Sequence, residues 1–188
     1  MKYTQLRGEQ TLVIRGAQKE DASLFLEYIN KVCTESDNLT FGEGEFGITP
    51  EKEAELIEEI AKSDNQLMIC AFIEDKLVGQ LVFRAGSRPR IRHSGEFGIT
   101  VLKEYWGMGI GKELISYLIK WAKETQIIRK INLKVRSDNL KAIGLYTKVG
   151  FISEGTITRE FLINGQFYSC IHMGMEINSF SKFLGKKG

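Results

Sequence analysis

The sequence predicts an α/β fold of the α+β kind in a single domain, residues 1–188. Of its 188 residues, 43% are hydrophobic, which is enough for one domain with its own core. Along the chain the apolar residues switch between the period of two typical of strands and the 3.6 period of helices. Asn164-Gly165 stands between two alternating stretches and is a strong hairpin signal. We expect the core to span residues 12–177 and residues 178–188 to form a basic tail.

The first third of the chain predicts a strand followed by two helices. Leu12–Arg15 reads as the strand, and the apolar residues of Asp21–Ile29 share one helical face, although the end of this helix is blurred near Cys33. The second helix has a clearer start. Thr49 is a candidate N-cap, and Pro50 occupies the first helical position, where its missing N–H costs nothing.

The middle of the chain predicts strands. Leu67–Ile73 and Leu77–Phe83 are apolar runs joined by the polar turn Glu74–Lys76, so we expect a hairpin. A further β-type segment, Glu96–Val101, leads into a glycine-rich stretch.

That stretch is Tyr105–Lys112, and an amphipathic helix from Gly109 to about Lys123 follows it. Glycines at alternate positions let the backbone turn tightly and approach a ligand closely. The N–H groups at a helix N-terminus favour an anion. We therefore expect a pyrophosphate to be held by the backbone N–H groups of Trp106, Gly107, Met108, Gly109, Ile110, Gly111 and Lys112.

Two common phosphate motifs do not fit this stretch. A P-loop requires Ser or Thr after Gly-Lys, but Glu113 follows Lys112. A dinucleotide fingerprint has Gly-x-Gly-x-x-Gly spacing near the start of a βαβ unit, which this mid-chain stretch lacks. A glycine-rich turn without a ligand is the plainer alternative.

The remaining elements follow the glycine-rich stretch in order. Ile131–Val135 alternates like a half-buried strand, and Asn139–Val149 reads as a helix. Thr156–Ile163 and Phe167–Ile177 then form the hairpin that turns at Asn164-Gly165.

Two stretches resemble the signatures of the GNAT N-acetyltransferase family. Gly109 and Gly111 match the glycines of Gln/Arg-x-x-Gly-x-Gly/Ala, whereas Trp106 departs from the expected Gln or Arg. The stretch from Asn139 to Phe151 matches Asn-x-x-Ala-x-x-x-Tyr-x-x-x-Gly-Phe. The order of elements also matches, and the resemblance covers nearly the whole chain.

This resemblance implies the GNAT fold, a mixed, mostly antiparallel sheet of about seven strands with helices on both faces. The family's fourth and fifth strands, here near Glu96–Val101 and Lys130–Arg136, would splay into a cofactor cleft. The cofactor would be acetyl-CoA, with its pantetheine arm in that cleft. Besides the glycine-rich stretch, the resemblance assigns cofactor binding to Gly98, Ile99, Thr100, Val101, Asn139, Ala142 and Tyr146.

The implied activity is direct transfer of an acetyl group from acetyl-CoA to a primary amine. Tyr146 is the expected acid for the leaving thiolate, and Glu96 or a water molecule the expected base. Plainer roles stay open: Tyr146 as a packing residue, Glu96 as an exposed strand residue, and Asn139 as a helix cap. A non-catalytic acyl-CoA-binding sensor is the alternative function.

For the acceptor we look to Thr34–Thr49, a segment rich in glycines and acids that in this family walls the acceptor site. Glu43 and Glu45 would attract a cationic amine, and Phe41 would pack against its aliphatic part. A small primary amine, a polyamine, a peptide N-terminus or a lysine would fit. A solvated flexible loop is the alternative.

Composition argues against several other classes of protein and of site. A net charge of +2 gives no basic field for nucleic acid, and no run approaches the ~20 apolar residues of a membrane span. The scattered Cys33, Cys70 and Cys170 fit reduced thiols and a cytoplasmic location. With only two histidines we expect no metal site. Whether the chain forms a homodimer stays open.

Overall fold

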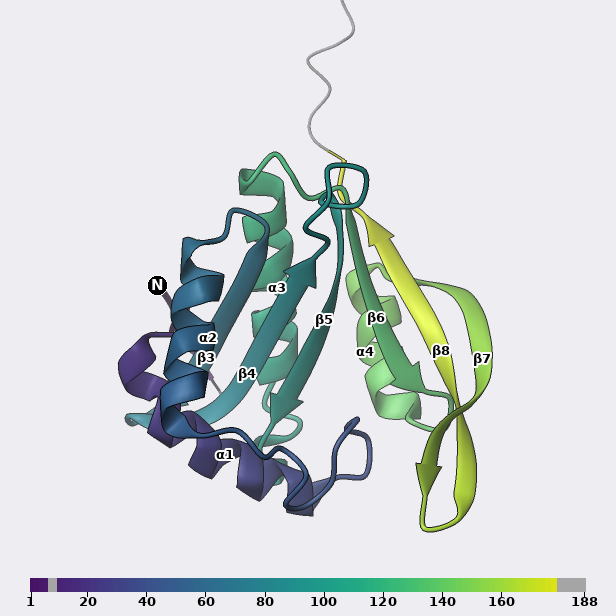
Figure 1. Cartoon of the computed structure of the whole chain (residues 1–188), viewed down its shortest axis with the longest axis horizontal. Coiled ribbons are helices and arrows are strands. Elements are labelled where there is room, and N and C mark those ends of the chain that lie inside the picture. Colours follow the sequence, from purple (N-terminus) through teal and green to yellow (C-terminus); the bar gives the residue numbers. More distant parts are fainter. Residues whose placement is uncertain (7–9, 179–188) are drawn as a thin grey trace, which may run out of the picture.

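The computed structural model describes residues 1–6 and 10–178, so the tail beyond Asn178 lies outside the described residues. They form an eight-stranded sheet with helices on both faces (Figure 1). Helices α1 (Ala22–Glu35) and α2 (Pro50–Lys62) cover one face, and α3 (Ile110–Glu124) and α4 (Leu140–Val149) cover the other. The strands are β1 (Lys2–Gln5), β2 (Thr11–Gly16), β3 (Gln66–Ile73), β4 (Lys76–Ala85), β5 (Ser94–Val101), β6 (Lys130–Arg136), β7 (Ile152–Ile163) and β8 (Gln166–Glu176).

The strand order is β1-β2-β3-β4-β5-β6-β8-β7. Only β5 and β6 pair in parallel, so the expected mixed, mostly antiparallel sheet is confirmed. The strand missing from the expectation is β1, which pairs with β2 from Lys2↔Ile14 to Gln5↔Thr11. Its four residues are mostly polar, and an edge strand buries too little to impose a clear apolar pattern.

A core lies on each face of the sheet. Leu114 and Leu118 of α3 pack with Phe83 and Phe97 of the sheet, and all are buried. On the opposite face, Phe25 of α1 and its neighbours pack against α2 and β3. Because strand side chains alternate between faces, the burial of Phe97 in the first core turns Glu96 toward the face of α1 and α2.

The helix ends agree with the sequence signals in two places and differ in one. Thr49 Oγ1 accepts a hydrogen bond from the N–H of Lys52 at 3.4 Å, which caps α2. Asn139 Oδ1 accepts from the N–H of Ala142 at 3.2 Å, which caps α4. Helix α1 continues to Glu35, past the blurred end expected near Cys33, because Val32 and Cys33 extend its buried face.

The parallel pairing of β5 with β6 is short. It joins Ser94–Glu96 to Lys130–Asn132 and then stops, so both strands have unpaired edges beyond that point. Figure 1 shows the two strands close at one end and diverging toward the other. We call this unpaired stretch, Phe97–Val101 facing Leu133–Arg136, the strand gap; it confirms the expected splay.

Two features are absent from residues 1–6 and 10–178. No helix among them is long and apolar enough to cross a membrane. No group of three His, Cys, Asp or Glu side chains among them lies close enough to hold a metal ion. Cys33, Cys70 and Cys170 are buried free thiols.

Candidate active site

The backbone N–H and C=O groups of β5 point alternately toward β4 and toward β6. The carbonyl of Ser94 accepts from the N–H of Gly86 at 3.3 Å, and the N–H of Leu102 donates to Val78 O at 3.0 Å, so even-numbered residues face β4. The carbonyl of Gly95 accepts from Asn132 Nδ2 at 3.1 Å, so odd-numbered residues face β6. In an antiparallel pair this alternation continues along the strand.

The N–H and C=O groups of Phe97, Ile99 and Val101 are therefore directed into the strand gap. An edge of this kind can pair with an extended ligand arm. Of the expected contacts, Ile99 and Val101 have the required direction. The backbone N–H and C=O groups of Gly98 and Thr100 are directed at β4 instead. These two residues therefore do not offer their backbone to the arm, which corrects the expectation for them.

Hydrogen bonds of two side chains hold the turn that follows β5. The N–H of Lys103 donates to Glu35 Oε2 of α1 at 2.7 Å. The indole N–H of Trp106 donates to Val101 O at 2.7 Å. These bonds fix the turn on both sides before the glycine-rich loop begins.

The loop itself presents unpaired donors. Gly107 and Gly109 have φ values of +80° and +89°, conformations that favour glycine. In the part of the chain that the structure describes, the N–H groups of Gly107, Met108 and Gly109 have no protein acceptor. The N–H of Trp106, also expected to hold the anion, instead donates to Lys103 O at 3.1 Å, so this expectation is corrected. The first α3 bond of this turn runs from Glu113 N to Gly109 O, at 3.1 Å, so the preceding N–H groups of the helix are free as well.

The space in front of the loop is open. A Cβ added at Gly107 or Gly109 would meet nothing within 4 Å, so an anion can approach the free donors. Gly111 differs, because a Cβ there would lie 3.4 Å from Leu145 Cδ2 of α4. Close packing of α3 on α4 is thus a second reason for glycine at that position.

Tyr146 lies at the narrow end of the strand gap. Its ring packs edge-on against Phe97, the first residue of the gap, with 6.0 Å between centroids, and against Phe151 at 6.1 Å. Burial raises the pKa of Tyr146 from 10.0 to about 12. No protein group among the described residues hydrogen-bonds its hydroxyl, which therefore stays protonated and available at neutral pH.

Glu96 lies beside Phe97 but on the opposite face of the sheet. It is exposed, and within the described residues its carboxylate has no ion pair or hydrogen bond. The sequence left open whether Glu96 is a base or an exposed strand residue; the structure places it in solvent on the α1 and α2 side. The acid and base candidates therefore flank the narrow end of the gap from its two faces.

The expected acceptor segment is anchored beside the end of β6. Arg136 Nη1 donates to the carbonyl of Asp37 at 2.9 Å. The same guanidinium pairs with Asp138 at 2.6 Å and stacks 3.9 Å above the ring of Tyr168. Arg136 thus ties the segment after α1 to β6 and β8.

The three acceptor candidates have different surroundings. Phe41 is half-buried against Phe46, with 5.0 Å between centroids, so it packs its own segment onto α1. Glu45 Oε2 accepts from the N–H of Gly42 at 2.7 Å and so holds a local turn. Glu43 is exposed. No hydrogen bond or ion pair of the described residues joins these three to Tyr146 or Glu96.

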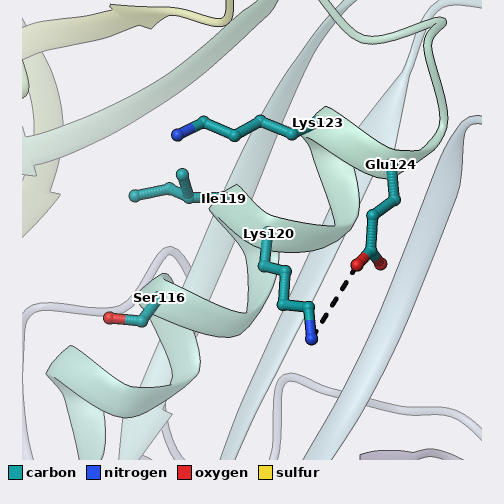
Figure 2. Close-up of a pocket in the computed structure, with 5 residues that line it drawn as sticks. All are labelled: Ser116, Ile119, Lys120, Lys123 and Glu124. Atoms are coloured by element: carbon teal, nitrogen blue, oxygen red, sulfur yellow. Dashed lines mark ion pairs between the residues drawn. The ribbon is translucent and has the colours of Figure 1, made fainter.

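A shallow surface hollow also lies on α3, but at the far end of the helix from the free donors. Figure 2 shows its lining, from Ser116 and Ile119 to Lys123. Lys120 and Glu124 form an ion pair of 3.8 Å across it. An open hollow lined by solvated side chains offers no catalytic group, so the candidate site is the strand gap and the loop beside it.

Comparisons with known proteins identify the family to which this fold belongs. Residues 33–151 match the acetyltransferase (GNAT) family. The crystal structure of a GNAT-family acetyltransferase from Streptococcus pneumoniae superposes with a TM-score of 0.86 at 33% identity, covering 89% of this chain and 99% of that one.

Two relatives carry named activities. L-amino acid N-acetyltransferase AaaT of Escherichia coli is 33% identical over 108 residues, 57% of this chain and 65% of AaaT. Spermidine N(1)-acetyltransferase of Vibrio cholerae is 36% identical over 77 residues, 41% of this chain and 44% of that enzyme. The matched segments thus span less than two thirds of either relative.

The helix caps give a test of whether Asn139 also contacts the cofactor. Asn139→Ala and Thr49→Ala each remove a cap, so each should lower the free energy of unfolding by about 1 kcal/mol, measured by denaturant titration. Thr49 is the matched control because α2 lies on the other face of the sheet. If Asn139→Ala alone raises the KM for acetyl-CoA, Asn139 contacts the cofactor; equal KM values for both variants would limit it to capping.

Proposed function

The chain belongs to the GNAT family of acetyltransferases, and on this premise we propose that it transfers an acetyl group from acetyl-CoA directly to a small cationic primary amine. As a member of this family it is an acetyl-CoA-dependent N-acetyltransferase. The observation that carries the proposal is the continuity of the unpaired β5 edge with the free N–H groups of the glycine-rich loop. An extended arm and a pyrophosphate need these two surfaces in this order.

The cofactor is held mainly by backbone. The pyrophosphate lies against the N–H groups of Gly107, Met108 and Gly109 and the first turn of α3. The arm extends along the gap-facing groups of Ile99 toward Phe97. This direction brings the thioester to the narrow end of the gap, beside Tyr146.

An acceptor that arrives as an ammonium ion loses two protons from its nitrogen, one before it attacks and one afterwards, and the departing sulfur gains one proton. The neutral amine attacks the thioester carbonyl carbon, the C–N bond forms, and the C–S bond then breaks with its electron pair leaving on sulfur. Tyr146 donates its proton to the departing thiolate. The proton that the ammonium ion loses before it attacks passes to Glu96 or to a water molecule on the exposed face, and the second nitrogen proton leaves to solvent after the C–N bond has formed.

Two observations support a cationic acceptor. Glu96 and Glu43 are exposed carboxylates, and carboxylates beside a site attract a cationic amine. The relatives named for L-amino acids and for spermidine both acetylate amines. A polyamine or another small primary amine therefore ranks ahead of a peptide N-terminus or a lysine. The sensor alternative needs no Tyr146 and has no observation in its favour.

The test of this function is thiol release from acetyl-CoA across a panel of amines. Polyamines, amino acids, N-terminal peptides and lysine peptides would each be offered at matched concentration. Turnover of small cationic amines is the expected result. Binding of acetyl-CoA without turnover on any of them would favour the sensor.

Tyr146→Phe removes the acid while keeping the ring. We expect kcat to fall by about 10²-fold or more and the KM for acetyl-CoA to stay within about twofold. Because the pKa is raised, the acid stays protonated below pH 10 and is lost only as the pH rises toward about 12. The wild type should therefore show no Tyr146-dependent fall of kcat between about pH 7 and 10. Tyr3→Phe, exposed on β1, is the control; an unchanged kcat in Tyr146→Phe would remove the acid role.

Glu96→Gln separates a protein base from a water relay. If Glu96 accepts the proton, kcat/KM for the amine should fall by about 10²-fold at neutral pH, and the loss should shrink at higher pH, where more amine is already neutral. Rates measured from pH 7 to 10 check this. Wild-type rates throughout that range would assign proton removal to water.

Glu43→Gln tests the acceptor segment. The loss of one carboxylate should raise KM severalfold for a dicationic amine and have little effect for a neutral one, with the difference fading at high salt. Glu55→Gln on the exposed side of α2 is the matched control. Equal KM values for the two variants would place Glu43 outside the acceptor site.

A further inference from the structure

Trp106 is an unusual residue for its place. It stands where the family signature has Gln or Arg, and its side chain is 47% exposed. Its indole N–H is already used, because it donates to Val101 O at 2.7 Å. Indole has no other donor and no charge, so this side chain cannot replace the polar contacts of Gln or Arg.

Val101 is the last residue of β5 whose main chain faces the strand gap. Its carbonyl already accepts the indole N–H, so only its second lone pair and its own N–H are left for an extended arm. Farther along β5, toward Phe97, the gap-facing N–H and C=O of Ile99 are both free of partners among the described residues. The Trp106–Val101 bond in this way limits where the arm can lie along the strand.

The exposed ring lies between two parts of the cofactor site. The strand gap ends at Val101, and the unpaired N–H groups begin at Gly107, immediately after Trp106. In acetyl-CoA the group next to the pyrophosphate is the pantoate unit, whose quaternary carbon carries two methyl groups. An exposed aromatic ring at this junction offers those methyl groups an apolar surface.

We propose that Trp106 is a positioning residue for acetyl-CoA: its N–H fixes the end of the arm's path, and its ring packs against the pantoate methyl groups. This inference rests on the proposed function, because it needs the cofactor to occupy the gap and the loop. Cofactor recognition at this position is then apolar, in place of the polar side chain of the signature.

Tryptophan fluorescence gives a direct readout. The chain has two tryptophans, and the other, Trp121, packs edge-on against Phe83 at 5.7 Å on α3. In a Trp121→Phe protein the emission reports on Trp106 alone. CoA should shift or quench this emission, whereas ADP, which carries the pyrophosphate without the arm, should leave it nearly unchanged.

Variants at Trp106 separate the contribution of its N–H from that of its ring. Trp106→Phe keeps an aromatic ring but loses the N–H that holds the ring at the junction, so KM for acetyl-CoA should rise about fivefold with kcat within about twofold. Trp106→Ala loses both features and should raise KM further. Trp106→Gln restores a donor without the ring and should fall between them. Melting temperatures identify any variant whose fold has changed.

The outcomes are distinguishable from failure of the proposed function. Calorimetry first measures binding of CoA to the wild type, and no binding would overturn the proposed function together with this inference. If CoA binds but the emission of the Trp121→Phe protein does not change, or if it changes equally with ADP, the inference alone is overturned. An unchanged KM in a folded Trp106→Ala protein would overturn it as well.

Discussion

The early end of the pairing between β5 and β6 is the constraint on which the rest of the site depends. Their ladder joins Ser94–Glu96 to Lys130–Asn132 and then stops. Asn132 strengthens the joined end, because its Nδ2 donates to Ser94 Oγ and to Gly95 O, each at 3.1 Å. With that end fixed, the divergence leaves main-chain groups on β5 that no strand satisfies, and unpaired backbone of this kind is suited to bind an extended ligand.

Helix α1 connects the two sides of the site. Glu35, near its end, accepts from the N–H of Lys103 in the turn that leads to the glycine-rich loop. The segment that follows α1 is tied to the end of β6 through Asp37 and Arg136. A displacement of α1 would therefore move both the start of the cofactor loop and the expected acceptor segment. The proposed cofactor surface and the proposed acceptor surface are therefore both held in place by α1.

Much of the fold could be predicted from the sequence, because apolar periodicity, helix caps and two spaced motifs agreed with one another. The edge strand β1 was missed since its polar residues carry no core pattern. The direction of Glu96 could not be predicted, because alternation fixes a face only once the buried side is known. For the same reason Gly98 and Thr100 were grouped with Ile99 until the register separated them. The bond from Trp106 to Val101 has no sequence signal at all, because it joins a side chain to a carbonyl through the shape of the turn.

The two faces of the gap offer different environments to the two proton transfers of the proposed mechanism. Tyr146 is buried among Phe97 and Phe151, where burial keeps its hydroxyl neutral and able to donate toward the thiolate that departs beside it in the proposed mechanism. Glu96 is on the solvent-exposed side, where an ammonium ion would arrive from solvent and a released proton could leave through water. Exchange of the two positions would leave a carboxylate unpaired in an apolar pocket and a phenol in water. The alternation of Glu96 and Phe97 along one strand therefore places the two proposed proton transfers on opposite sides of the sheet, one exposed to solvent and one buried.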